Sequence, residues 1–420
     1  MEKYSTYKIW INGLRKGLLY YYLFVYALYL YLNKGIAYSF LAESVLVVGL
    51  LFILLSLKQL QLIWNNPILI VSIFFIASLL AILFSIGKYP LTTILQDASM
   101  FLYPGFVLVI FLFQDDWDFF IKKLITLYAW YPLVAFCSYQ LSANCIDFRE
   151  FVLFGNVPLA LVKYGDMAIH LLITSLLLAA GYIRFRLPIL IINALLIFYL
   201  VLLIATYTRG GLLAYLLPFL IFLYARRREL AAVINRKTII VALGCIITAV
   251  FLYLNSNDEP NFQGRSIGFD QLSKNLTSVF SVQEEGALTD NKLWRLAWWY
   301  KLFSDALDPV RGLVGVGVGP SLTLLGDVGT DDELLRSPHS FHLSILARFG
   351  IPIFLLWIFW MWLHFSKIRS EKKESFAFLI LLSILGFIIN ASFDVYLEGP
   401  MGAFAFWTWV GVLYVNDFKS

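Results

Sequence analysis

Charged side chains at the ends of apolar runs are the residues of this sequence best suited to chemistry. Arg209 ends one such run and is followed by Gly210 and Gly211. A guanidinium is a planar, permanently charged set of donors that suits phosphate oxygens. A helix that begins at Gly210 would add oriented backbone amides. These features predict an anion site, although an arginine that snorkels to the membrane surface is the alternative.

Arg295 is a second candidate for the same anion. It lies in a polar stretch, three and four residues before Trp298 and Trp299. We predict that Arg209 and Arg295 face one anion, a diphosphate. The alternative is a basic residue that contacts lipid head groups beside interfacial tryptophans.

His339 is the residue we expect to act as a general base. Histidine is scarce, with four in the chain, and His339 lies at the start of a long apolar run where an aqueous vestibule would meet the bilayer. A neutral imidazole can accept the proton of a sugar hydroxyl, and its ordinary pKa is near the working pH. A histidine whose polar tip only reaches interfacial water is the alternative.

His342 follows His339 by about one helical turn, and we predict that it binds substrate. The two histidines also allow a metal site completed by Asp331, Asp332 or Glu333. Those carboxylates belong to an acidic run of a kind that usually forms solvated surface. We therefore predict no metal ion and no other cofactor.

Asp394 and Glu398 lie in a short polar segment between the last two apolar runs. Carboxylates there could orient a catalytic histidine or hold an acceptor sugar, and they could equally cap helices. We assign Asp394 to the predicted substrate-binding residues.

The composition places these residues in a membrane protein. Of 420 residues, 60% are hydrophobic and only 14% are charged, and the mean hydropathy is +0.79. A soluble fold of this size needs far more surface charge, so a soluble enzyme is excluded. The net charge of +5 is too small to indicate nucleic acid as a partner.

Apolar runs of membrane-spanning length predict an all-α polytopic membrane protein, because unpaired backbone groups are costly in lipid. We expect about twelve transmembrane helices, at 18–33, 36–57, 68–87, 97–113, 124–141, 167–183, 187–207, 211–225, 238–255, 341–364, 375–393 and 400–415.

Lysine and arginine favour the short loops on one side, including 226–228 and 367–373, and the positive-inside rule places both chain termini in the cytoplasm. On the other side, the long polar segment 256–340 is expected to be functional. Within it, 291–307 predicts an amphipathic helix whose tryptophans lie at the membrane interface. A second outer segment, 142–166, mixes charged and apolar residues and predicts an interfacial or re-entrant piece. We treat 1–420 as a single membrane domain.

The glycine-rich run 309–320 lacks the flanking strand and helix that a nucleotide-binding loop requires, and it predicts a tight external turn.

Two spaced motifs resemble those of a known family. His339-Ser340, nine residues and then Gly350 are similar to the histidine motif of bacterial O-antigen ligases, and Arg209, three residues and then Leu213 are similar to their arginine motif. A long outer loop with Arg295 between the motifs also resembles the wider superfamily of ligases, polymerases and oligosaccharyltransferases. Ile353 stands where the ligase pattern often has Gly, Thr or Val, which favours the superfamily more than the ligase within it.

The resemblance implies a lipid-dependent glycosyltransferase of the GT-C type in the bacterial inner membrane, with its active site facing the periplasm. The implied donor is an undecaprenyl-diphosphate-linked glycan, and for a ligase the acceptor is lipid A core. The implied reaction is inverting and needs no metal. Arg209 and Arg295 would hold the diphosphate and His339 would activate the acceptor hydroxyl.

Two other functions are consistent with the same residues. An O-antigen or capsule polymerase would use the same donor, with a second lipid-linked repeat as acceptor. A transporter of lipid-linked glycans would also use intramembrane arginines, but it would not need His339 and would more often show repeated halves.

Overall fold

The computed structural model describes residues 2–56, 66–155, 157–159, 163–233, 236–255, 273, 287–322 and 336–419. The first part contains α1 (Glu2–Leu32), η1 (Asn33–Ile36), α2 (Leu41–Ser56), α3 (Asn66–Ser85), α4 (Leu91–Leu102), α5 (Gly105–Phe111), η3 (Gln114–Asp116) and α6 (Trp117–Asn144). The middle contains α7 (Ile146–Glu150), β1 (Val152–Phe154), β2 (Val157–Pro158), α8 (Tyr164–Ala179), α9 (Leu187–Tyr207), α10 (Arg209–Ala225), α11 (Arg227–Val233) and α12 (Arg236–Leu254). The last part contains α14 (Ala287–Asp305), α15 (Pro309–Val314), α16 (Phe341–Ser370), α17 (Phe376–Ala391), η4 (Tyr396–Glu398) and α18 (Pro400–Lys419).

Each of the twelve predicted apolar runs lies on a helix, and the run at 97–113 is divided between α4 and α5, which are bent by 52°. By length and composition, four of the described helices can cross a membrane, or five if this bent pair is one span. Several other runs form shorter apolar helices, including α8, α10 and α17. The prediction of an all-α membrane protein is therefore confirmed, whereas the number twelve stays a prediction.

The segment predicted to be interfacial, 142–166, contains the end of α6, the short helix α7 and the antiparallel pair β1–β2. Gly35 of η1 packs against this segment, because a Cβ built on Gly35 would lie 2.1 Å from the carbonyl oxygen of Leu159. Leu159 is thereby held against η1.

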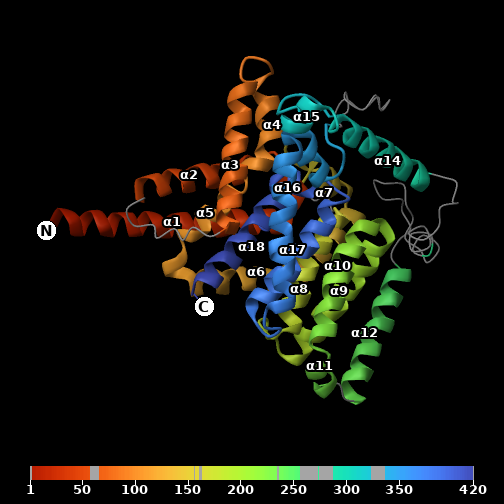
Figure 1. The fold of residues 1–420 in the computed structure, drawn as a ribbon. Coiled ribbons are helices and arrows are strands. Elements are labelled where there is room, and N and C mark those ends of the chain that lie inside the picture. Colours follow the sequence, from red (N-terminus) through yellow and green to blue (C-terminus); the bar gives the residue numbers. More distant parts are fainter. Residues whose placement is uncertain are drawn as a thin grey trace.

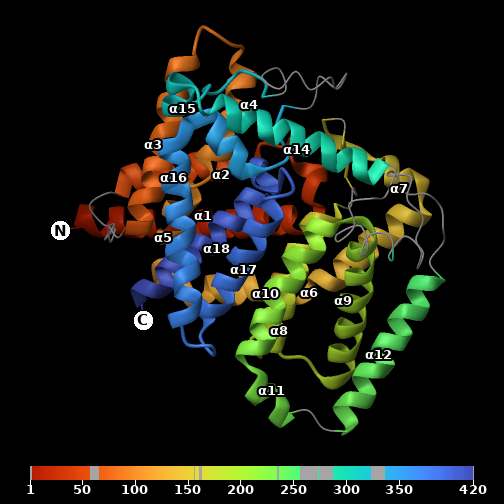
Figure 2. The same ribbon diagram turned by 45° about the vertical axis from the view of Figure 1, so that its right-hand side comes forward.

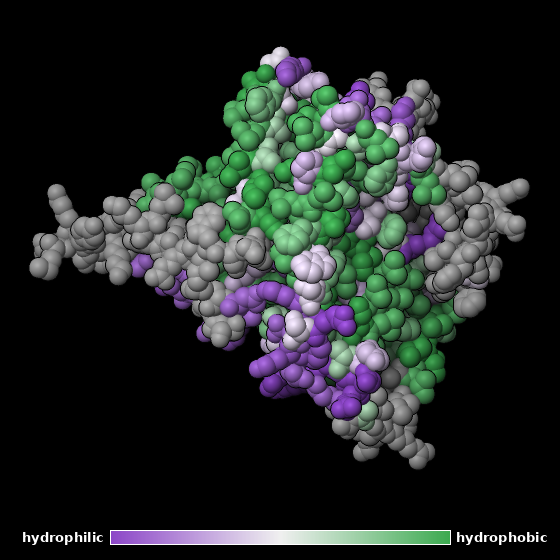
Figure 3. Space-filling model, viewed as in Figure 1, coloured by the Kyte–Doolittle hydropathy of each residue, from purple (hydrophilic) through white to green (hydrophobic). Residues whose placement is uncertain are grey.

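Helices α8, α9, α10, α16 and α17 run alongside one another, and α1 crosses behind them (Figures 1 and 2). α17 lies inside this bundle, where almost all of its residues are buried. Hydrophobic side chains cover the outside of α3, α12 and α16, and a hydrophilic patch marks the lower end of the bundle (Figure 3). Large exposed residues of α16 such as Leu355 and Trp362, each 59% exposed, are suited to contact lipid.

The two ends of the bundle differ in charge. Around the lower end, the loops after α8, α10 and α16 carry basic residues, and the ring of Tyr182 lies 5.0 Å from that of Phe376. At the opposite end, α8, α10 and α16 begin and α17 ends (Figure 2). Because the N-terminus of a helix carries partial positive charge, three such ends favour an anion at this place.

A break in α16 explains one residue of the histidine motif. Gly350 has φ 75°, in the left-handed region, within the helix. A Cβ on Gly350 would lie 2.6 Å from the carbonyl oxygen of Gly312 in α15. Glycine is therefore needed both for the backbone conformation and for the close approach of α15. Ile353, the departure from the ligase pattern, is partly buried against the core just after this break.

Candidate active site

His339 lies immediately before α16, in a loop that α14 holds. The indole Nε1 of Trp299 donates to the carbonyl oxygen of Pro338 over 2.8 Å. His339 itself has φ 53°, a left-handed conformation that is uncommon outside glycine. Such a conformation is costly and persists where the surrounding structure enforces it.

Trp298 of α14 faces inward, so the prediction that it lies at a membrane interface is wrong. Trp298 is fully buried and donates from Nε1 to the carbonyl oxygen of Leu322, and it packs with Leu343 and Leu346 of α16. An indole can satisfy its single donor inside the protein, which allows this burial. The outward apolar residues of this part of α14 include Leu296, Phe303 and Tyr300, of which Tyr300 is 77% exposed.

Asp394 lies in the turn after α17 and is held from two sides. Its Oδ1 accepts from Lys163 Nζ over 2.8 Å and from the backbone N–H of Val395 over 2.6 Å. Lys163 also lies 3.6 Å from Oδ1 of Asp166 in the first turn of α8. Burial opposes ionisation of Asp394, but Lys163 outweighs it and lowers the pKa of that carboxyl. Asp394 is therefore an anion at neutral pH.

Glycines allow the elements around Asp394 to approach closely. A Cβ on Gly165 would lie 3.2 Å from Oδ1 of Asn390 and 3.4 Å from Oδ2 of Asp394. A Cβ on Gly211 would lie 3.0 Å from the Cα of Gly165, so the beginnings of α8 and α10 are in contact. Thr208 caps α10, where its Oγ1 accepts from Gly211 N over 3.2 Å.

Arg209 and Arg295 are brought to the same place from α10 and α14. Arg295 Nη1 donates to the carbonyl oxygen of Phe393 over 3.0 Å, and Gly210 lies against the side chain of the same residue. Burial lowers the pKa of Arg295, Asp394 opposes that shift and the charge of Arg209 adds to it. Two like charges that influence each other in a partly buried site favour a bound anion.

Burial and nearby charges keep the ring of His339 neutral. Burial, Arg295, Lys163 and Lys34 lower the pKa of His339 and Asp394 opposes them, with a net result of about 4. A neutral imidazole can accept a proton, which is the state that a general base requires.

His342 lies deeper, between α16 and α17. Trp357 Nε1 donates to His342 Nδ1 over 2.9 Å, and His342 Nε2 lies 3.0 Å from Ser392 Oγ and 3.3 Å from the carbonyl oxygen of Ile388. Because Nδ1 accepts, Nε2 carries the proton. His342 therefore supports the turn that carries Asp394, and its contact with substrate stays a prediction.

Glu398, the other carboxylate considered from the sequence, binds within the protein. Ser344 Oγ donates to Glu398 Oε1 over 2.7 Å, and Ser337 Oγ lies 3.4 Å from Ser344 Oγ. Burial raises the pKa of Glu398, although the bonds from Ser337 and Ser344 oppose that shift. These contacts join the turn after α17 to the loop before α16.

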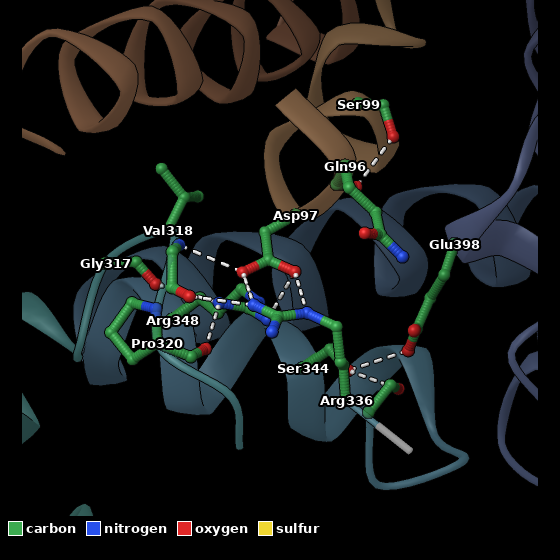
Figure 4. Close-up of polar contacts among 12 residues, drawn as sticks. Gln96, Asp97, Ser99, Gly317, Val318, Pro320, Arg336, Ser344, Arg348 and Glu398 are labelled. Atoms are coloured by element: carbon green, nitrogen blue, oxygen red, sulfur yellow. Dashed lines mark hydrogen bonds and ion pairs between the residues drawn. The ribbon is translucent and has the colours of Figure 1, made fainter. Parts of the chain in front are cut away.

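A second buried charge cluster holds the glycine-rich run in place (Figure 4). Asp97 of α4 pairs with Arg336 Nη2 at 2.8 Å and with Arg348 Nη2 at 3.1 Å. Arg348 Nη1 also donates to the carbonyl oxygens of Gly317 and Pro320, over 3.1 and 3.3 Å. The run forms α15 and then a turn with positive φ at Gly315, Gly317 and Gly319.

The structure brings four of the five predicted site residues, Arg209, Arg295, His339 and Asp394, to one end of the bundle, and places His342 just beneath. Lys34, Lys163 and Asp166 also belong to this cluster and were not assigned to it from the sequence. The charges of the 142–166 segment were visible there, but nothing in the spacing pointed from Lys163 to Asp394.

No three His, Cys, Asp or Glu side chains in the described part of the chain gather as metal ligands would. The acidic residues Asp331, Asp332 and Glu333, which the metal alternative requires, lie outside the described residues.

No curated protein is similar to this chain. The family model for O-antigen ligase matches residues 194–358, a segment that contains Arg209, Arg295, His339, His342 and Gly350. The resemblance to O-antigen ligases predicted from the arginine and histidine motifs is thereby confirmed for this segment, which is about two fifths of the chain.

Proposed function

We propose that this protein transfers a glycan from undecaprenyl diphosphate to a sugar hydroxyl of lipid A core on the periplasmic face of the bacterial inner membrane. The observation that carries the proposal is the meeting of a neutral His339 with Arg209, Arg295 and Asp394 at one end of the bundle. The family match supports a ligase or polymerase activity in general.

The diphosphate is assigned to the arginines. Among the described residues, four basic side chains, Lys34, Lys163, Arg209 and Arg295, lie with two acidic ones, Asp166 and Asp394, and burial raises the pKa of Asp166 to about 7, so positive charge exceeds negative charge by at least two. This excess, together with the beginnings of α8, α10 and α16, favours a diphosphate that enters from the lipid. Guanidinium groups add paired donors of fixed geometry for phosphate oxygens.

The transfer follows from these positions. A ring nitrogen of His339 takes the proton of the acceptor hydroxyl, and the hydroxyl oxygen forms a bond to the anomeric carbon. The bond from that carbon to the phosphate oxygen breaks, and the electron pair leaves with undecaprenyl diphosphate. Arg209 and Arg295 stabilise the charge that develops on this leaving group. Attack from the face opposite the diphosphate inverts the anomeric carbon, and no step requires a metal ion.

The arrangement in the membrane follows the same proposal. The basic loops at the lower end of the bundle face the cytoplasm and the His339 end faces the periplasm, as the positive-inside rule requires. Twelve spans of a GT-C fold would then return both termini to the cytoplasm.

The test is deletion of the gene in its native host, with lipopolysaccharide and undecaprenyl-linked glycan separated side by side on a gel. A ligase leaves long polymer on the carrier and bare lipid A core. Core that carries a single repeat would instead identify a polymerase, and an unchanged ladder would contradict both functions.

Complementation then separates an enzyme from a transporter. Wild-type protein should restore the ladder, and His339→Gln should not, although it should still bind the lipid-linked donor. Arg311→Gln is the matched control, because Arg311 is exposed on α15 outside the cluster. A transporter of lipid-linked glycans would tolerate His339→Gln.

A further inference from the structure

Lys163 is the one basic side chain of the cluster for which the structure gives two carboxylate partners. Its Nζ lies 2.8 Å from Asp394 Oδ1 and 3.6 Å from Asp166 Oδ1. Burial would lower the pKa of Lys163, but the charges of Asp166 and Asp394 outweigh it and raise that pKa above its ordinary value. The ammonium group is therefore permanently charged at this place.

Of the two acidic partners of Lys163, Asp166 is the more deeply buried. Its side chain is fully buried, and within the described residues neither oxygen has a hydrogen-bond partner. Lys163 is the cation that lies within 4 Å of it, with Lys34 of η1 acting from further away. Burial raises the pKa of Asp166 to about 7 and the charge of Lys163 opposes that shift, so the lysine is what favours the ionised form of this buried carboxyl.

The side chain of Asp394 is held in one orientation by its neighbours. Lys163 and the N–H of Val395 both donate to Oδ1, which fixes the plane of the carboxylate, and Oδ2 is packed near Gly165. A Cβ at position 165 would be in van der Waals contact with Oδ2, at 3.4 Å, and would press on Asn390 Oδ1, at 3.2 Å. Asp394 in turn influences both His339 and Arg295 by its charge.

We propose that Lys163 is a positioning residue of the transfer reaction, which holds the carboxylate of Asp394 in place beside His339 and Arg295 before substrate binds, with Asp166 anchoring the lysine from the other side. This inference rests on the proposed function. It adds residues 163–166, which lie outside the segment that matches the family model. The diphosphate itself is left to Arg209 and Arg295.

The charged groups that act on His339 come from four elements. They are Lys34 of η1, Lys163 before α8, Arg295 of α14 and Asp394 after α17, while Arg209 at the start of α10 acts on Arg295 and Asp166 lies behind the lysine. Since Lys163 helps to lower the pKa of His339, removing its charge should raise that pKa. The shift is a readout that does not depend on catalysis.

The experiment compares Lys163→Met with Lys163→Arg in the full-length protein in lipid nanodiscs. Histidine labelled with ¹³C is titrated by NMR, and His339→Gln identifies the His339 signal among the four histidines. Lys163→Met should move the His339 titration to higher pH, whereas Lys163→Arg should leave it near the wild-type position. Turnover should fall by about 10- to 100-fold in Lys163→Met because Asp394 is displaced, and Lys163→Arg should recover most of it.

Donor binding decides between positioning and direct contact. The probe is undecaprenyl diphosphate, and its affinity should change less than about threefold in Lys163→Met. An affinity loss as large as the loss of turnover would overturn the proposal, since Lys163 would then bind the diphosphate. The proposal would also be overturned if Lys163→Met and Lys163→Arg lost turnover to the same extent, with the same fall in melting temperature.

Failure of the proposed function gives a different result. If wild-type protein transfers no glycan, that function is wrong, but the NMR titration still tests whether Lys163 sets the charge around His339. An unchanged His339 titration in Lys163→Met would contradict the positioning role even in an active enzyme.

Discussion

The protein contains two buried charge clusters that are built from similar residues and differ in how completely they are satisfied. Around Asp97, two arginines divide their donors between one carboxylate and the carbonyl oxygens of the glycine-rich turn. Around Asp394, four basic side chains outnumber two carboxylates, and the oxygens of Asp166 lack hydrogen bonds among the described residues.

The two clusters differ in where the arginine donors go: Arg336 and Arg348 give theirs to Asp97 and to backbone carbonyls, whereas Arg295 contacts one carbonyl and lies near Arg209. Arg348 is 1% exposed and its charge is compensated by Asp97, so it fastens α4, α16 and the turn together. Arg295 is near Arg209 and contacts one backbone carbonyl, so it retains capacity for an anion. The first cluster should control stability, and the second should control activity.

The largest expected effect is on turnover. His339→Gln removes the general base and should lower the rate of glycan transfer by about 10²- to 10⁴-fold. The melting temperature in nanodiscs should change little, because the ring is not part of the packed core. The measurement is transfer from purified lipid-linked donor to lipid A core. If His339→Gln lowered both the melting temperature and the activity, the claim that this cluster controls activity rather than stability would be contradicted.

Arg348→Met should have the opposite pattern. It leaves Asp97 buried with one cation fewer and should destabilise the protein by about 3–5 kcal/mol. Thermal denaturation should show a large fall, while turnover per folded molecule stays near the wild-type value. Asp97→Asn is the companion variant, and it should destabilise the same turn. Normal stability with lost turnover in Arg348→Met would place this arginine in the reaction.

Trp299→Phe should have an intermediate, mixed effect. It removes one hydrogen bond to the carbonyl of Pro338, worth about 1 kcal/mol. The His339 loop should become less rigid, and turnover should fall about fivefold with a small change of melting temperature. Trp362→Phe is the control, because Trp362 is exposed on the outside of α16. Equal effects of the two substitutions would show that α14 does not position His339.

The smallest effect is expected from pH in the neutral range. The base must be neutral, and burial together with Arg295 lowers the pKa of His339 to about 4. Transfer should therefore stay constant near neutral pH and fall as the pH drops through about 4. Stability should begin to fall earlier, as the pH drops below about 6.5, because the unfolded histidine takes up a proton first. A rate that already falls near pH 6.5 would mean that His339 is not held neutral.

Helices were predictable because apolar composition over membrane length leaves few other structures, and all twelve runs lie on helices. The sequence did not predict where a helix would break or how long each helix would be. The run at 97–113, for example, is divided between α4 and α5 by a bend of 52°. Trp298 was misplaced because a tryptophan in a polar segment suits an interface and a packed core equally well.

The site was predictable where one residue alone suggests its chemistry. Arg209, Arg295, His339 and Asp394 were identified as a charged or titratable group beside an apolar run, and the fold brings them together. Lys163 was missed because its meaning depends on Asp394, which lies 231 positions later in the chain. Sequence spacing carries no information about such a contact.

Because Lys163 and Asp394 are 231 positions apart, they enter the membrane at different stages of synthesis. Ribosomes deliver α8 and α10 to the membrane long before the turn that carries Asp394, and Arg295 finds its carbonyl partner 98 residues later. A chain interrupted after α16 would contain both arginines and His339 but not the carboxylate that Lys163 holds. The candidate site therefore comes together only after α17 and the turn that follows it have been made.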